Sequence, residues 1–164
     1  MTMKEMMDVM PQTGKVEWIS IRPEKRGVVK AIEEVQVNVE NGLEGDHYGK
    51  KGGKRMITLI QAEHIATVEG ILQKTVDPKL LRRNIVVSGI NLLALKDRVF
   101  QVGESVQLKT TGLCHPCSRM ETNLGEGGYN AMRGHGGITC MVLRGGNIRL
   151  GDAVRLLVEE EEKK

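Results

Sequence analysis

Aromatic residues are scarce in this sequence. Only four occur among its 164 residues, namely Trp18, Tyr48, Phe100 and Tyr129. Proteins that bind single-stranded nucleic acid usually stack the bases on aromatic side chains, and four scattered rings cannot easily supply such a platform. The composition therefore argues against a nucleic-acid partner and favours a small-molecule ligand.

Long apolar runs and a secretory leader are also missing. No segment approaches the roughly 18 consecutive apolar residues that a membrane-spanning helix needs, and residues 1–10 lack the apolar block of a signal peptide. We therefore expect a cytoplasmic protein with no membrane partner. With 40% hydrophobic and 27% charged residues, length and composition fit one globular domain.

The sequence is rich in glycine and contains local clusters of positive charge. The 20 glycines exceed the usual share of about 7% and predict many turns and close backbone approaches. The net charge is +3, and basic residues gather in three places that suit an anionic ligand or a phosphate. Each cluster taken alone is more often a solvated surface. The clusters are Arg22/Lys25/Arg26, Lys50/Lys51/Lys54/Arg55 and Arg82/Arg83.

Short strands dominate the predicted secondary structure. One amphipathic helix is expected at 61–74, and Asp77-Pro78 has the N-cap and first-position residues of a second, short helix that runs through Arg82. The expected strands are 16–21, 35–39, 56–60 and 85–87, followed by 102–108 and 150–156, each of which begins at a glycine turn.

These elements predict a mainly β fold. We expect a closed or partly open β-barrel with a few short peripheral helices, because closure removes exposed strand edges. A doubly wound α/β sheet is disfavoured because helices do not alternate regularly with strands. Residues 1–13 are assigned to a disordered N-terminal extension, 14–158 to a single domain and 159–164 to a charged C-terminal tail.

The chemistry-bearing residues concentrate between positions 111 and 137. Ser118 and Glu121 have the spacing of a capping box, which predicts a short helix that begins at Ser118. Cys117 then lies directly before the helix, where backbone N–H groups, Arg119 and a protonated His115 favour the thiolate. We therefore predict Cys117 as the reactive sulfur. The alternative is a buried structural thiol.

Cys114 lies three positions before Cys117, and the pair has three interpretations. A thioredoxin-like redox motif would belong to a βαβ pattern, which the sequence does not show. A structural zinc site needs four ligands, and Cys114, Cys117, His135 and Cys140 could supply them, although their spacing matches no recognised zinc module. In the third interpretation Cys117 works alone, with Cys114 as a helper or bystander.

Further candidate ligand-binding residues lie outside the cysteine pair. The glycines around His135, including Gly136, would let a ligand approach closely, and a guanidinium can bind an oxyanion through two hydrogen bonds. A loop Asp-His pair can orient an imidazole, although such a pair is more often a turn. These candidates are Arg83, Asn84, Arg133, His135 and Gly136, with Asp46 placed to orient His47.

Together, these motifs resemble the MOSC domain, the C-terminal domain of molybdenum-cofactor sulfurases, and most closely its small stand-alone bacterial members. The resemblance covers about residues 14–157, with the motifs in family order. It rests on the segments 45–47, 83–92, 103–104, 114–121, 133–137, 145–148 and 151–152.

The resemblance implies a MOSC-type β-barrel whose functional cysteine is Cys117. In sulfurases a pyridoxal-phosphate cysteine desulfurase domain passes sulfur to this domain. In related amidoxime-reducing enzymes the corresponding cysteine ligates molybdenum, and residues like Arg83 and Asn84 help to hold the pterin phosphate. Because this chain contains no pyridoxal-phosphate domain, the resemblance implies a partner: a desulfurase-type sulfur donor that carries that cofactor, or a redox partner.

Two roles for Cys117 therefore remain open. As a sulfur carrier it would hold a persulfide, with Arg119 and His115 stabilising the negative charge. As a metal ligand it would bind molybdenum cofactor, with Arg83, Asn84, Arg133 and basic side chains near Lys54 holding the pterin, in the reduction of N-hydroxylated compounds. The alternative from another class is a non-catalytic zinc-binding or interaction module built on Cys114, Cys117 and His135.

Overall fold

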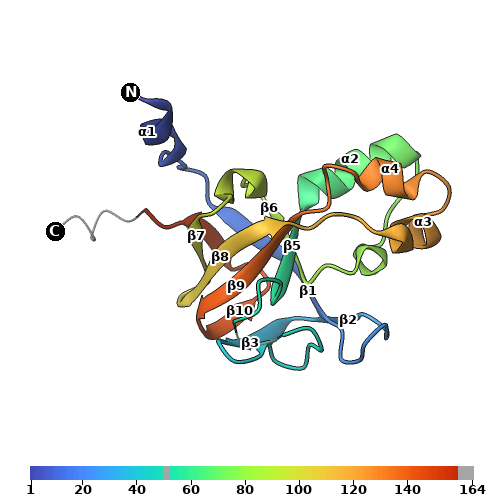
Figure 1. Ribbon diagram of the computed structural model, residues 1–164, viewed down its shortest axis with the longest axis horizontal. Helices are drawn as coiled ribbons and strands as arrows, with labels where there is room; N and C mark the ends of the chain where they lie inside the picture. The colour runs from blue at the N-terminus through green and yellow to red at the C-terminus, as the bar shows by residue number, and fades with distance from the viewer. Residues whose placement is uncertain (50–51, 159–164) are drawn as a thin grey trace.

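The computed structural model describes residues 1–49 and 52–158 (Figure 1). The helices are α1 (Met3–Met7), α2 (Ala62–Leu72), α3 (Ser118–Leu124) and α4 (Gly128–Met132), with 3-10 helices η1 (Pro78–Leu81) and η2 (Leu92–Leu95). The strands are β1 (Gly14–Ile21), β2 (Lys30–Ile32), β3 (Glu34–Asn38), β4 (Gly42–Leu43), β5 (Ile57–Gln61), β6 (Ile85–Ser88), β7 (Val99–Val102), β8 (Val106–Leu113), β9 (Ile138–Arg144), β10 (Gly146–Arg149) and β11 (Ala153–Leu156).

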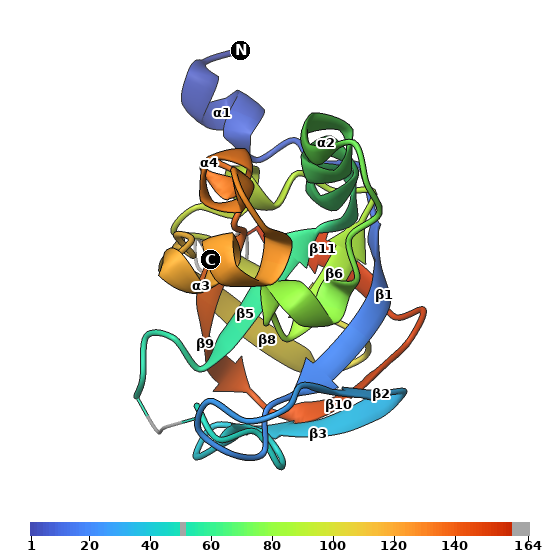
Figure 2. The same ribbon diagram turned by 90° about the vertical axis from the view of Figure 1, so that its right-hand side faces the viewer.

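The main sheet closes into a seven-stranded barrel, which confirms the predicted fold class. The strand order is β11-β7-β8-β9-β5-β6-β1, and β1 returns to pair with β11, with Lys15 opposite Ala153. β2 extends the sheet beyond β1, while β10, β3 and β4 form a small second sheet at one end of the barrel (Figure 2).

Buried apolar side chains form two cores on the two sides of β5. All residues of β5 are buried. Leu59 belongs to the core inside the barrel, whereas Ile60 belongs to a smaller core beneath the helices. This second core includes Val68 of α2, Leu124 of α3 and Met132 of α4. The continuous apolar pattern of β5 therefore places these three helices against the outer surface of the barrel (Figure 2).

One connection in the barrel is of the βαβ type, which the sequence pattern does not reveal. β5 and β6 pair in parallel, with Leu59 opposite Ile85, and α2 and η1 lie in the chain between them. The cysteine pair lies elsewhere, after β8, which pairs antiparallel with both of its neighbours. The second expected helix is present as η1, with Asp77 as its N-cap.

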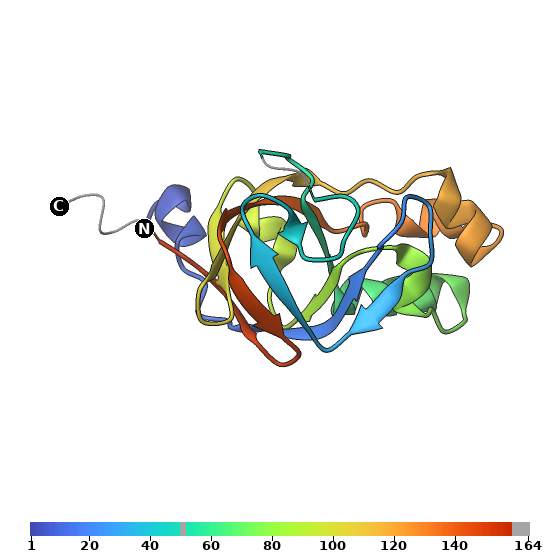
Figure 3. The same cartoon turned by 90° about the horizontal axis from the view of Figure 1, so that it is seen from below.

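The N-terminal residues differ from the expectation of a disordered extension. Met3–Met7 form α1, and Arg98 ties the end of this helix to the barrel by donating to Asp8 Oδ1 (2.5 Å) and to the Met7 carbonyl (3.1 Å). These residues show no helical apolar period because α1 buries no residue. α1 lies at the opposite end of the barrel from α3 and α4 (Figure 3). The predicted tail, 159–164, lies outside the described residues.

In the part of the chain that the structure describes, no helix has the length and apolar character that crossing a membrane requires.

The barrel core makes a first prediction. Phe100 of β7 is fully buried and pairs with Leu108 of β8. Phe100→Ala should lower the free energy of unfolding by about 3–5 kcal/mol, because it removes apolar contacts and leaves a cavity. Urea denaturation measures this loss. Leu143→Ala, at a β9 position that is 43% exposed, is the control, and equal losses in the two variants would contradict the assignment of Phe100 to the core.

Candidate functional site

The cysteine segment, residues 114–117, connects β8 to α3. Cys114 is buried and Cys117 is exposed. The four residues contain no turn or bend, so the chain runs extended here (Figure 1). A thioredoxin-like motif belongs to a βαβ unit, whereas this segment follows β8, which pairs antiparallel with both of its neighbours. The structure therefore does not support that interpretation of the pair.

The helix predicted at Ser118 is confirmed, but its cap is different. Cys117, not Ser118, is the N-cap of α3, with extended backbone angles. Glu121 does not complete a capping box. Its carboxylate instead accepts hydrogen bonds from the backbone N–H groups of Gly127 and Tyr129, both 3.0 Å long. Glu121 thereby fixes the turn between α3 and α4, and these two bonds hold the pKa of its carboxyl group below the usual value.

Arg83 connects the cysteine segment to two other parts of the chain. It is 8% exposed. Its Nη2 donates to the Cys114 carbonyl (3.3 Å), its Nη1 to the Leu81 carbonyl (2.9 Å) and its Nε to the Gly136 carbonyl (2.7 Å). Burial lowers the pKa of Arg83, but a guanidinium remains charged in proteins. The structure therefore places this predicted ligand-binding residue directly behind the cysteine segment.

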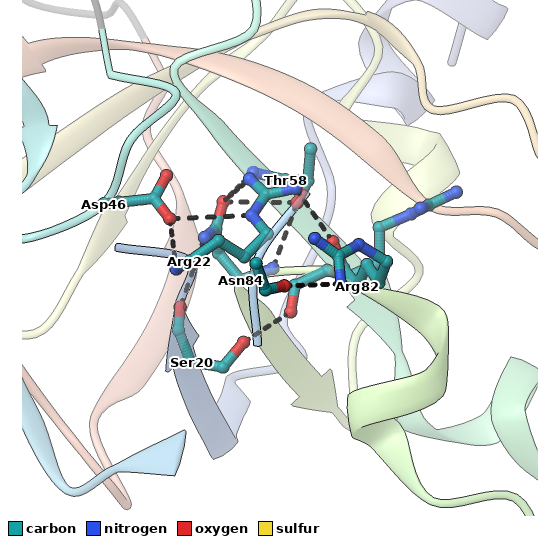
Figure 4. Close-up of polar contacts among 8 residues, drawn as sticks. Ser20, Arg22, Asp46, Thr58, Arg82 and Asn84 are labelled. Carbon is teal, nitrogen blue, oxygen red and sulfur yellow. Dashed lines mark hydrogen bonds and ion pairs between the residues drawn. The ribbon is translucent and has the colours of Figure 1, made fainter. Parts of the chain in front are cut away.

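Arg22 lies at the centre of a buried polar network (Figure 4). Its Nη1 donates to the Arg82 carbonyl (3.0 Å), and its Nε is 3.5 Å from Asp46 Oδ1. The backbone N–H of Arg22 donates to the same carboxylate oxygen (2.7 Å). Asp46 therefore holds Arg22, and the prediction that it orients His47 is wrong. The ring of His47 is instead edge-on to Tyr48.

Asn84 supports this network from inside the sheet. It is fully buried, and its Oδ1 accepts hydrogen bonds from the Thr58 N–H (3.0 Å) and from Arg22 Nη2 (3.3 Å). Its Nδ2 donates to the Ser20 carbonyl (3.2 Å). With its amide bonded in this way, Asn84 joins β1, β5 and β6 behind the site. The prediction that Asn84 contacts a ligand directly does not fit this position.

Tyr48 and Arg82 extend the network to the surface. The Arg22 guanidinium carbon lies 4.1 Å from the centre of the Tyr48 ring, and Arg82 Nη1 donates to the Gly27 carbonyl (3.0 Å). Burial alone would raise the pKa of Tyr48, but a backbone hydrogen bond to Arg26 and the charges of Arg22 and Arg82 lower it. Tyr48 was not among the predicted site residues. The basic clusters Arg22/Lys25/Arg26 and Arg82/Arg83 are the sequence features that point to this part of the site.

Arg55, in the connection between β4 and β5, also contacts the cysteine segment. Arg55 Nη2 is 3.9 Å from Cys114 Sγ. We call Arg22, Arg55, Arg82 and Arg83 the arginine cluster. Lys54 is exposed beside Arg55, whereas Lys50 and Lys51, from the same predicted basic cluster, lie outside the described residues.

The predicted histidines and the remaining predicted arginines differ in burial and in their contacts. His115 is exposed and Arg119 is half-buried. Arg133 is exposed, and its Nη1 is 3.5 Å from Asn130 Oδ1. The His135 ring is half-buried between α4 and α2, with Nδ1 3.2 Å from the Ala131 carbonyl and its centre 5.3 Å from the His64 ring. Burial and the neighbouring His135 lower the pKa of His64.

The zinc interpretation finds no support in the described residues. Among them, no three His, Cys, Asp or Glu side chains gather closely enough to hold a metal ion. His135 faces α2, and Cys140 is fully buried in β9, where burial raises its pKa well above the usual range. The expectation that Cys140 is a core residue is confirmed. A module built on Cys114, Cys117 and His135 is therefore not favoured.

Comparison with solved structures shows the fold in other proteins. YuaD from Bacillus subtilis superposes with a TM-score of 0.77 at 22% identity, over 90% of this chain and 98% of that one. YiiM from Geobacillus stearothermophilus gives 0.70 at 15% identity, over 88% and 75%. YiiM from Escherichia coli gives 0.65 at 16% identity, over 88% and 70%. No curated protein sequence is similar enough to count as a match.

Fold and site define a small β-barrel domain with one exposed cysteine, in a segment that two members of the arginine cluster contact. The family model of the MOSC domain matches residues 44–155, which include the cysteine segment and three of the four clustered arginines. The chain belongs to the MOSC domain family, as the sequence resemblance predicted.

The Glu121 bonds predict a pH-dependent contribution to stability. Because the folded-state pKa of Glu121 lies below its unfolded value, its stabilising effect is complete above the unfolded value of about 4.3. The effect is lost as the pH falls through the folded value. Glu121→Ala should therefore lower the melting temperature at pH 7, and the difference from wild type should shrink towards pH 3. Glu126→Ala, on the neighbouring loop, is the control. A difference that stays constant with pH would contradict this role.

Proposed function

We propose that this MOSC domain binds the molybdenum cofactor and that the Cys117 thiolate is the ligand of the metal. The observation that carries the proposal is the exposed thiol of Cys117 at the end of a segment that two arginines contact: Arg83 Nη2 donates to the Cys114 carbonyl (3.3 Å), and Arg55 Nη2 is 3.9 Å from Cys114 Sγ. A thiolate is a soft ligand suited to such metals. The pterin part of the cofactor carries a phosphate, and guanidinium groups bind phosphate through paired hydrogen bonds.

The arginine cluster fits an anionic group. Among the described residues, the ion pair that this cluster makes is Arg22 with Asp46. In the same part of the chain, Arg82 Nη2 is buried and has no hydrogen-bond partner. A buried unpaired donor is costly, and a phosphate oxygen would satisfy it. These residues therefore support an anion-binding role.

Each residue of the site then has a separate task. Cys117 would bind the metal, because it is the exposed thiol. Arg82 and Arg55 would face the phosphate and pterin, while Asp46 and Asn84 hold Arg22 in place from behind. When bound, the cofactor supplies two-electron redox chemistry, which suits the reduction of N-hydroxylated compounds with electrons from a redox partner. The three free cysteines fit a reducing compartment, and we propose the cytoplasm.

Sulfur transfer is a second candidate, and the exposure of Cys117 favours it. A partner desulfurase, carrying pyridoxal phosphate, would present a persulfide. The Cys117 thiolate would attack the outer sulfur, a new S–S bond would form on Cys117, and the donor cysteine would leave as a thiolate. An exposed thiol at the start of a helix is accessible to such a donor.

Cofactor retention tests the first candidate. Protein purified from a molybdenum-replete host should carry molybdenum and a pterin that becomes fluorescent on oxidation. Cys117→Ser should lower both by about tenfold or more, because the thiolate ligand is lost. Cys140→Ser is the matched control, since it changes a buried thiol of the barrel. Full molybdenum and pterin content in the Cys117→Ser protein would contradict the proposal.

Mass spectrometry tests the second candidate. After incubation with a cysteine desulfurase and cysteine, the mass of one sulfur atom should be added to the peptide that contains Cys117. Cys117→Ser should abolish this addition, whereas Cys140→Ser should leave it unchanged. Sulfur found on another cysteine, or on none, would exclude the carrier role.

A further inference from the structure

Two histidine rings meet between α2 and α4. The centres of the His64 and His135 rings are 5.3 Å apart and the rings are inclined at 74°, so they meet edge to face. His64 lies in the first turn of α2, and His135 follows the C-terminal end of α4. Both residues are half-buried. The proposed function uses neither ring, although the sequence motifs predicted that His135 binds a ligand.

His135 is bonded to α4. Its backbone N–H donates to the Met132 carbonyl (2.8 Å), and its ring Nδ1 lies 3.2 Å from the Ala131 carbonyl oxygen. A carbonyl oxygen can only accept, so we assign the proton of the neutral ring to Nδ1. Ala131 and Met132 are buried in the core beneath the helices. The ring of His135 therefore moves with α4, and its contact with His64 joins α4 to α2.

Protonation of both rings would weaken this contact. Two imidazolium rings at this separation repel each other, and the N-terminal end of a helix, where His64 lies, disfavours an added positive charge. Among the described residues, neither ring takes part in an ion pair. Burial and the neighbouring His135 lower the pKa of His64, and Glu63 partly counteracts them.

The charged groups on the surrounding elements are mostly engaged elsewhere. Glu63 Oε2 accepts the Gly89 N–H (3.0 Å), and the carboxylates of Glu69 and Glu121 also accept backbone N–H groups. In the described chain, β5, β6 and α4 carry no Asp, Glu, Lys or Arg. The other charged or titratable groups on α3, on α4 and directly after α4 are Arg119, Tyr129 and Arg133. Protons on the histidine pair therefore gain little compensation in the folded state.

We propose that the contact between His64 and His135 is an acid-sensitive latch, which holds α4 and residues 133–135 against α2 while both rings are neutral and releases them when the pair takes up protons. In the released state His64 would have the ordinary histidine pKa of about 6.5. Because its pKa in the closed state is lower, the closed state loses stability as the pH falls below that value.

The released element borders the cysteine segment. The Gly136 carbonyl, directly after His135, accepts from the Arg83 guanidinium, which also donates to the Cys114 carbonyl. The latch itself does not depend on the proposed function.

Amide hydrogen exchange of residues 128–135 tests the latch. It is measured on the full chain at pH 7.5 and at pH 5.5 and corrected for the intrinsic exchange rate at each pH. Protection should fall about threefold to tenfold at the lower pH, because the released state binds protons more readily. Glu121 does not cause this fall, because its carboxyl group titrates below about 4.3.

Variants separate the histidine pair from other effects of pH. His64→Phe keeps a ring at the contact but cannot take up a proton, so its protection should be the same at both pH values. His135→Gln covers the case in which His64→Phe does not fold, and the same result is expected. His115→Gln changes an exposed histidine and should keep the wild-type pH dependence. Equal protection of the wild type at both pH values, or a wild-type fall in either folded variant of the pair, would overturn the inference.

Discussion

A positive charge buried against the cysteine segment organises the functional end of this molecule. Moving a guanidinium out of water is costly unless each donor finds an acceptor. Arg83 finds its acceptors on three backbone segments that are far apart in the sequence. The need to satisfy one side chain therefore fixes the relative positions of η1, the cysteine segment and the loop that enters β9.

The barrel provides the rigid base for this arrangement, and β5 is its most connected part. Leu59 packs into the barrel core and Ile60 packs under the helices. Thr58 on the same strand donates to Asn84, which in turn accepts from Arg22. A single strand thus links the closed sheet, the helices that carry the cysteine and the network that holds the arginines. A shift of β5 would therefore displace the closed sheet, the helices and the arginine network together.

Local sequence patterns predicted much of the fold. Alternating and continuous apolar runs located the strands around Trp18, Val37 and Leu59, and the glycine turns at Gly103 and Gly151 have the positive φ angles that such turns require. The helix start at Ser118 was predictable from residue types within a few positions. These features depend on neighbours in the chain, so one sequence is enough to show them.

The partners of polar side chains were much less predictable. Asp46 bonds to Arg22, which lies 24 positions away, instead of to the adjacent His47, and the partners of Asn84 come from β1 and β5. Such choices are made by the folded sheet, which no local pattern encodes. α4 was missed for a different reason. It begins at Gly128, where a Cβ would lie 2.6 Å from the Leu124 Cβ, so close packing requires a residue that otherwise disfavours helices.

The extended course of residues 114–117 affects how the Cys117 thiol withstands oxidation. Peroxide converts an exposed thiolate to a sulfenic acid, which a nearby thiol normally rescues by forming a disulfide. Cys114 is buried whereas Cys117 is exposed, so the neighbouring thiol is poorly placed to repair damage at Cys117. The Cys117 thiol then stays reduced only if a bound ligand or partner covers it or if cellular reductants restore it.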